Sequence, residues 1–204
     1  MIRFPRDDDD AQPLRISHAV PLWSDLDWCY HQACAARSDI HEHLPLLRAL
    51  AEDHERPMTV VEMGVRAVVS TWAFLAARPL HVTSVDVERH PNVDVALAVA
   101  EAAGVSFKFE LADTLAMAPV ACDLLFVDTL HTYAQLRAEL RRHAVTVQRF
   151  IALHDTETFG DRGENGERPG LRQAVRDFQQ AEGRGWRTAL DLVNCNGLMV
   201  LERW

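Results

Sequence analysis

Runs of consecutive apolar residues recur along this chain, and their length and composition predict buried β-strands. The first is MTVVEM at residues 58–63, which is short, rich in β-branched side chains and free of glycine and proline. Such runs are typical of strands that are covered on both faces of a sheet. The pattern predicts seven strands, at residues 58–63, 82–87, 106–111, 123–128, 150–154, 186–193 and 198–202.

Between most of these runs, apolar residues recur every three or four positions, which is the period of an amphipathic helix. Two segments begin with capping-box spacing, Asp39 with Glu42 and Thr132 with Gln135. We predict helices at 40–53, 70–77 and 92–103, and two more that begin near residues 132 and 171. A short helix over 21–36 carries aromatic side chains that could cap a substrate pocket, lie at a dimer interface or pack into the core.

Strands that alternate with helices predict parallel βαβ units with right-handed crossovers, so we expect one α/β domain. The last two strands are separated only by Asn194 to Gly197, which predicts an antiparallel hairpin at the sheet edge. The domain is expected to span 21–204, with 21–56 as an N-terminal helical cap. Residues 1–20, which contain the acidic run Asp7 to Asp10, are expected to form a flexible segment.

The overall composition is that of a globular protein and narrows the choice of partners. The chain has 204 residues and a formal net charge of -9, which argues against non-specific binding to nucleic acid or to an anionic membrane. Its four cysteines have no CxxC spacing, so we expect free thiols in a reducing cytoplasm. A small-molecule acceptor is the expected partner, and the aromatic segment at 21–36 is compatible with a homodimer.

Acidic residues and one glycine mark the ends of the first three predicted strands, where ligands bind in open α/β sheets. The first strand runs into Glu62 and Gly64, and Ser70 opens the next helix. Glycine lets the backbone approach a ligand, and the start of a helix offers free N–H groups. Asp86 ends the second strand, 22 residues after Gly64, and suits a contact with ribose hydroxyls. Asp113 follows the third strand and could accept from an adenine amino group or cap a turn.

The blocks VVEMGVRAVVSTWAFL, SVDVE, LADT, DLLFVDTLHTY and FIALHDTETFG resemble the class I SAM-dependent methyltransferases, in particular the cephalosporin-hydroxylase-like and macrolide-sugar O-methyltransferase branch. The resemblance implies a Rossmann-like, doubly wound, mostly parallel seven-stranded sheet with a C-terminal antiparallel hairpin. It implies that Glu62, Gly64 and Ser70 contact the methionine part of S-adenosyl-L-methionine (SAM). Asp86 would bind the ribose, and Asp113 would lie beside the adenine. NAD is the competing cofactor, but its pyrophosphate needs a GxGxxG turn that this chain lacks.

The fourth and fifth predicted strands end in VDTLH and LHDTE, which bring acids and imidazoles to one edge of the sheet. Because adjacent parallel strands end side by side, Asp128 and Asp155 are expected to lie close together and could bind one divalent ion. By the resemblance, Asp128 would be a metal ligand, His131 the general base, and Asp155 a second ligand. His154 stands where relatives usually carry an acid, and the expected metal set is Asp128, His154 and Asp155.

The expected cofactors are therefore SAM and a divalent metal, Mg²⁺ or Mn²⁺, although a histidine ligand favours Mn²⁺, Fe²⁺ or Zn²⁺ over Mg²⁺. These features predict a SAM-dependent O-methyltransferase that acts on a hydroxyl of a sugar or other small molecule, with the metal ion assisting. Two alternatives are a metal-dependent hydroxylase of the same family and a SAM-binding module without catalysis. The bulky Val68 in the cofactor turn, which could narrow the methionine pocket, and the substitution at His154 prompt the second alternative.

The segment that follows the fifth strand, residues 156–170, is longer than most loops in compact domains. Its position at the active-site edge is typical of a mobile lid. An ordinary surface excursion is the other interpretation.

Overall fold

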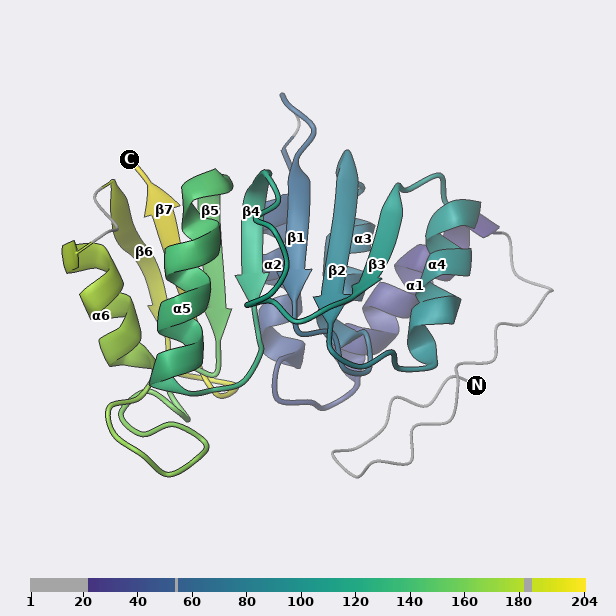
Figure 1. Cartoon of the computed structure of the whole chain (residues 1–204). Coiled ribbons are helices and arrows are strands. Elements are labelled where there is room, and N and C mark those ends of the chain that lie inside the picture. The colour runs from purple at the N-terminus through teal and green to yellow at the C-terminus, as the bar shows by residue number, and fades with distance from the viewer. Residues whose placement is uncertain (1–21, 54, 182–184) are drawn as a thin grey trace.

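The computed structural model describes residues 22–53, 55–181 and 185–204, so the prediction of a flexible segment at 1–20 lies outside the described residues. One seven-stranded sheet crosses the molecule in the order β3-β2-β1-β4-β5-β7-β6 (Figure 1). Its strands are β1 (Thr59–Met63), β2 (His81–Asp86), β3 (Phe107–Leu111), β4 (Cys122–Val127), β5 (Val147–His154), β6 (Trp186–Leu192) and β7 (Leu198–Arg203). The predicted α/β class and all seven strands are confirmed.

The helices connect these strands or precede them. They are α1 (Leu22–Ala35), α2 (Leu44–Ala51), α3 (Val69–Ala76), α4 (Asn92–Ala102), α5 (Tyr133–His143) and α6 (Leu171–Ala181), with short 3-10 turns η1 (His41–His43) and η2 (Ala144–Thr146). No helix of the described part of the chain is long and apolar enough to cross a membrane. All four cysteines are free, as the sequence predicts.

Strands β1 to β5 run parallel, and β7 lies antiparallel to both β5 and β6. The chain leaves β1 toward β2 and β3 on one side and returns to β4 on the other, so the strand order reverses between β1 and β4. In open α/β sheets this switch point is where ligands bind, beyond the carboxyl ends of the strands. The fold thus places the loops after β1, β2, β4 and β5 around one edge.

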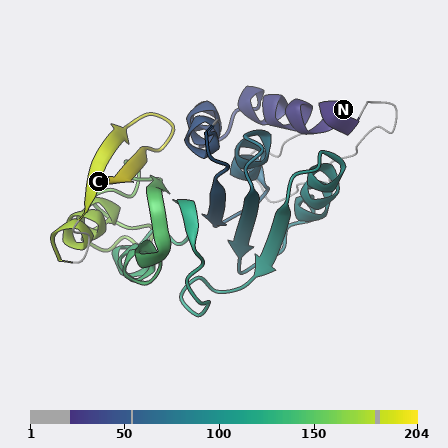
Figure 2. The ribbon, with the colours of Figure 1, turned by 90° about the horizontal axis from the view of Figure 1, so that it is seen from above.

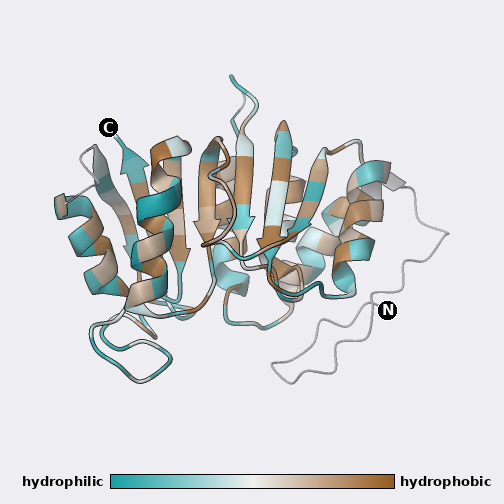
Figure 3. Cartoon of the chain, in the orientation of Figure 1, coloured by the Kyte–Doolittle hydropathy of each residue, from teal (hydrophilic) through white to brown (hydrophobic). Residues whose placement is uncertain are grey.

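Two helical layers cover the sheet, and alternate residues of each central strand supply their cores. Viewed from above, helices α1 to α4 lie on one face and α5 and α6 on the other (Figure 2). Val60 points into the cluster with α1 to α4, while its neighbour Val61 points into the cluster with α5 and α6. Strands buried on both faces need no polar alternation, which explains why they read as continuous apolar runs. Figure 3 shows the result, with β4 and β5 largely brown and the loop between β5 and α6 mostly teal.

One of the two predicted capping boxes forms in part, and the other does not form. Thr132 caps α5 through its side chain, which accepts from the Gln135 N–H at 3.3 Å. Near Asp39 the chain instead enters the 3-10 turn η1 and then α2, and neither start has a side-chain cap. The prediction of a box between Asp39 and Glu42 is therefore wrong, because the 3-10 turn shifts the start of the α-helix beyond these residues.

The turn after β1 depends on a glycine that packs directly against the loop after β4. Gly64 has φ of 87°, in the left-handed region that favours glycine. A Cβ atom added to Gly64 would overlap the backbone carbonyl of Asp128. The two loops can approach this closely only because Gly64 has no side chain.

We predict that Gly64→Ala lowers the free energy of unfolding by about 3 kcal/mol or more, because the backbone must shift as well as bear a strained φ. The matched control is Gly104→Ala, where φ is also positive, at 69°, but an added Cβ would meet nothing within 4 Å. That control should cost only about 1 kcal/mol. Urea denaturation compares the two variants, and equal losses would contradict the packing argument.

Candidate functional site

A cavity of about 420 Å³ opens at the switch point of the sheet, between the ends of β1 and β4. Its walls come from four places in the chain: residues 38–40 before η1, 64–70 after β1 with the exception of Val68, 86–91 after β2, and Asp128 after β4. The predicted cofactor residues Gly64, Ser70 and Asp86 are among these lining residues, and so is the predicted reaction-centre acid Asp128. One cavity therefore joins the two sites that the sequence analysis placed separately.

The turn between β1 and α3 takes a left-handed conformation at every second residue, at Gly64 (φ 87°), Arg66 (φ 42°) and Val68 (φ 74°). Only the first is glycine, and a positive φ is a rare conformation for a β-branched residue such as Val68. Asp86 compensates, because its Oδ2 accepts from the backbone N–H of Val65 at 2.7 Å and of Arg66 at 3.0 Å. A neighbouring carboxylate thus holds a turn that glycines usually form.

Val68 itself does not narrow the cavity. Its side chain is fully buried in the core beside α3, and it is absent from the cavity wall, which Ala67 and Val69 form on either side. The expectation of a narrowed pocket is therefore not met, because the left-handed backbone turns this side chain inward.

Glu62 lies beneath the turn and is completely buried. Its carboxylate accepts from the hydroxyls of Ser70 at 2.5 Å, Thr71 at 2.7 Å and Ser84 at 2.5 Å. Burial raises the pKa of Glu62 to about 7, although the three hydrogen bonds act in the opposite direction. The network ties β1 to β2 and to the start of α3, so Glu62 and the hydroxyl of Ser70 support the cavity wall from behind.

Asp113 occupies a different position from the other predicted cofactor residues. It is exposed, its Oδ1 accepts from the Leu115 N–H at 2.8 Å, and it is not part of the cavity wall. The turn-capping interpretation describes this geometry. Its contact with adenine stays a prediction.

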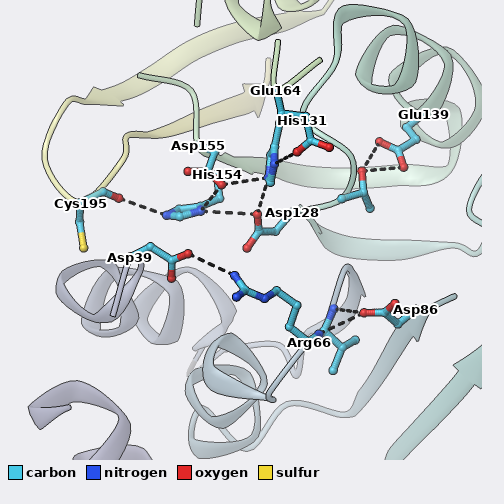
Figure 4. Close-up of polar contacts among 12 residues, drawn as sticks. Asp39, Arg66, Asp86, Asp128, His131, Glu139, His154, Asp155, Glu164 and Cys195 are labelled. Atoms are coloured by element: carbon cyan, nitrogen blue, oxygen red, sulfur yellow. Dashed lines mark hydrogen bonds and ion pairs between the residues drawn. The ribbon is translucent and has the colours of Figure 1, made fainter. Parts of the chain in front are cut away.

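Beyond Asp128 the carboxyl ends of β4 and β5 bring together acids and imidazoles (Figure 4). Ligand atoms of Asp128, His131 and Asp155 all lie within 4.8 Å of one another, a spacing that could hold a metal ion. His131 Nε2 is 3.1 Å from Asp128 Oδ1 and 2.9 Å from Asp155 Oδ2. The structure thus places the two predicted acids side by side and adds His131 to their group.

His154, the third member of the predicted metal set, has a fully buried side chain. Its Nε2 donates to the carbonyl of Cys195 at 3.2 Å. Its Nδ1 lies 3.5 Å from both Asp128 Oδ1 and Asp155 Oδ2 and has no hydrogen-bond partner among the described residues. The imidazole therefore faces the two acids without a close contact to either.

These groups shift one another's ionisation strongly. Burial lowers the pKa of His131 and of His154, but the contacts with Asp128 and Asp155 outweigh it. The short contacts and the charge of the acids raise the pKa of His131 to about 10, and the two negative charges 3.5 Å from Nδ1 raise the pKa of His154 to about 11. The same contacts lower the pKa of Asp155 and of Asp128 against the effect of burial. The cluster is therefore a set of anionic and cationic groups held in a largely dry place, which is typical of functional sites.

The loop between β5 and α6 packs against this cluster. Its Glu164 binds His131 twice: the carboxylate Oε2 is 2.8 Å from Nδ1, and the backbone N–H donates to the His131 carbonyl at 3.0 Å. Phe159 stacks on the His131 ring, with centroids 4.8 Å apart. The sequence analysis did not identify either residue, and the unusual length of the loop is the one signal that pointed toward them.

A second buried acid, Glu139 on α5, was also missed. It is fully buried and accepts from the hydroxyls of Thr114 at 2.6 Å and Thr129 at 2.9 Å, and from the Gln135 side chain at 2.9 Å. Burial raises its pKa. Thr129 follows Asp128 directly, so Glu139 fastens the loop that carries Asp128 to the helix behind it.

No family model and no curated protein matches the sequence. Among solved structures, the chain is similar to the N-methyltransferase NodS from Bradyrhizobium japonicum WM9 in complex with S-adenosyl-L-homocysteine, with a TM-score of 0.61 and 12% identity over 90% of this chain and 99% of that one. It is similar to a methyltransferase from Geobacter sulfurreducens, with a TM-score of 0.54 and 19% identity over 92% and 90% of the two chains. A protein from Corynebacterium glutamicum gives a TM-score of 0.61 and 18% identity over 92% and 91%. The predicted Rossmann-like methyltransferase fold is confirmed.

We predict that Glu62→Gln flattens the pH dependence of stability. Because the pKa of Glu62 is raised to about 7 in the folded chain, the native state holds a proton there that the unfolded state releases near pH 4.3. The wild type should therefore lose about 1–3 kcal/mol relative to the variant as pH rises from 4.5 to 7.5.

Urea denaturation at several pH values measures this difference. Glu101→Gln on the exposed side of α4 makes the same charge change and serves as the control. Parallel profiles for wild type and Glu62→Gln would show that the buried carboxyl does not titrate in this window.

Proposed function

We propose that this chain is a SAM-dependent O-methyltransferase that methylates a hydroxyl of a sugar or another small molecule, with a divalent metal ion at the reaction centre. The observation that carries the proposal is the single cavity that runs from the turn after β1 and Asp86 to Asp128. A methyl donor in the first part would end beside the acids of the second. The solved structure of NodS with S-adenosyl-L-homocysteine, on the same fold, supports the choice of cofactor.

The cavity wall suits SAM at two places. Gly64 and Ser70 bring the turn and the start of α3 to the cavity, where the methionine part would lie. Asp86 would hold the ribose: its two oxygens accept three backbone N–H groups, from Val65, Arg66 and Glu88. A carboxylate has about four acceptor positions, so one is left for a ribose hydroxyl, and the other three fix its orientation.

The donor set after β4 and β5 suits a divalent cation. Asp128 and Asp155 supply two negative charges at one place, and His154 directs a nitrogen toward both. Asp155 Oδ1 and His154 Nδ1 are buried without hydrogen-bond partners among the described residues, which is costly unless a ligand satisfies them. A metal ion held by these residues would supply Lewis-acid chemistry that lowers the pKa of the acceptor hydroxyl, the group that must act as nucleophile.

The chain's own residues would position the acceptor and keep water away. Asp128 borders both the cavity and the acid cluster, so it would orient the hydroxyl toward the methyl donor. Phe159 and Glu164 of the loop cover His131 from the other side. Since methyl transfer requires in-line alignment, this positioning is the main contribution that the protein can make.

The cofactor part of the proposal predicts that Asp86→Ala weakens SAM binding by at least tenfold, because both the ribose acceptor and the support of the turn are lost. Glu101→Ala, which removes an exposed acid of α4 outside the cavity wall, should change the affinity by less than threefold. Isothermal titration calorimetry of wild type and both variants with SAM, and with NAD⁺ as the competing cofactor, measures this. Wild type that binds NAD⁺ but no SAM would refute the proposal.

The reaction-centre part predicts that His131→Ala lowers turnover by about 100-fold or more, because the imidazole that contacts both Asp128 and Asp155 is lost and the reaction centre is no longer held in place. SAM affinity should stay within threefold, because His131 lies outside the cavity wall. The control is His81→Ala, which lies at the start of β2, away from the end of this strand that lines the cavity, and its turnover should be normal. Single-turnover methylation of hydroxylated sugars and phenols with labelled SAM provides the measurement. Normal turnover by His131→Ala would exclude this residue from the reaction.

A further inference from the structure

We infer that His131 is a metal ligand together with His154, so that two imidazoles and two carboxylates bind a first-row transition metal such as Zn²⁺ rather than Mg²⁺. The inference rests on the metal site of the proposed function and is independent of methyl transfer. It replaces the predicted role of His131 as a general base, because a ring nitrogen that binds a metal has no free lone pair for a proton.

The first argument is the direction of the His131 ring. Nε2 points at Asp128 Oδ1 and Asp155 Oδ2, at 3.1 and 2.9 Å, and these three atoms form the group with metal-ligand spacing. A base for an acceptor in the cavity would instead need this nitrogen to face the cavity, whose wall does not include His131. In Figure 4 dashed lines join the ring to Asp128 and Asp155 on one side and to Glu164 on the other.

The second argument is what the outer nitrogens of both rings do. His131 Nδ1 contacts the carboxylate of Glu164 at 2.8 Å, and His154 Nε2 donates to the carbonyl of Cys195 at 3.2 Å. Histidines that bind metals almost always donate their second N–H to a carboxylate or a backbone carbonyl, which fixes the tautomer and directs the other lone pair at the ion. Both rings show this arrangement, one with each kind of acceptor.

The third argument is the cost of the cluster without an ion. The side chain of His154 is fully buried, yet its Nδ1 faces Asp128 and Asp155 from 3.5 Å, too far for a good hydrogen bond. A cation bound between the four side chains would satisfy these groups together.

The nature of the donors then selects the metal. Mg²⁺ prefers oxygen ligands and keeps several waters, whereas imidazole nitrogen suits Zn²⁺, Mn²⁺ and Fe²⁺. Sites of almost any kind bind Zn²⁺ more tightly than Mn²⁺ or Mg²⁺, so affinity alone does not identify the ligands. The informative comparison is between two changes caused by the loss of His131: the Zn²⁺ affinity should fall, and the Mg²⁺ affinity should not.

The test uses the full chain freed of metal by chelation and dialysis. Competition with a chromophoric chelator measures the affinity for Zn²⁺, Mn²⁺ and Mg²⁺, and elemental analysis gives the stoichiometry. We expect one Zn²⁺ per chain, a loss of Zn²⁺ affinity of at least 100-fold in His131→Ala, and a change in Mg²⁺ affinity of less than threefold. Glu164→Gln should bind Zn²⁺ about 10- to 100-fold more weakly, because the carboxylate that orients His131 is removed.

His31→Ala, which removes an exposed histidine on α1, is the control for adventitious binding and should bind Zn²⁺ as the wild type does. Zn²⁺ affinity in His131→Ala within threefold of the wild type would overturn the inference, and so would tighter binding of Mg²⁺ than of Mn²⁺. If His131→Ala does not fold, two other measurements decide. Glu164 is partly exposed, and Glu164→Gln should still lose Zn²⁺ affinity. The absorption spectrum of Co²⁺ bound to the wild type should show the bands of nitrogen ligands, and a spectrum of oxygen ligands alone would overturn the inference. SAM titration of the same samples separates failure of this inference from failure of the proposed cofactor.

Discussion

The contact between Gly64 and the backbone of Asp128 is the constraint on which both parts of the site depend. Gly64 N–H donates to the Val85 carbonyl at 2.9 Å, and Asp128 N–H donates to the Met63 carbonyl at 2.8 Å, so the loops after β1 and β4 continue the sheet ladder to its edge. A side chain at residue 64 would force these loops apart. The cavity and the acid cluster meet at Asp128 because this one position has no Cβ atom.

Buried carboxylates hold the walls of the site from behind, each within a set of hydroxyl donors. Glu62 connects β1, β2 and α3, and Glu139 connects α5 with Thr114 and Thr129. A buried carboxylate is stable only when its acceptor positions are filled. Each of these two carboxylates therefore fixes several backbone segments at once. Apolar contacts would position the segments less precisely, because they have no preferred direction.

The sequence predicted what depends on local pattern and missed what depends on tertiary contact. The apolar runs at β1, β2 and β4 correspond to strands buried along nearly their whole length, because burial on both faces leaves a strong signal in the sequence. The conformations of Arg66 and Val68 could not be predicted, since the support for them comes from Asp86, a residue distant in the sequence. The contact of Glu164 with His131 could not be predicted for the same reason, because it depends on how the loop between β5 and α6 packs.

The exposure of the four side chains in the cluster indicates from which side the cluster is accessible. Asp128 is 22% exposed, His131 19%, Asp155 6% and His154 0%, so access decreases from β4 toward β5. Glu164 and Phe159 cover His131, while Asp128 alone of the four borders the cavity. In the proposed methyltransferase, an acceptor hydroxyl would meet the cluster at Asp128, next to the place where a methyl donor bound to Gly64 and Asp86 would end. His154 lies behind the two acids and is fully buried, whereas His131 keeps 19% exposure beside Glu164 and Phe159, outside the cavity wall.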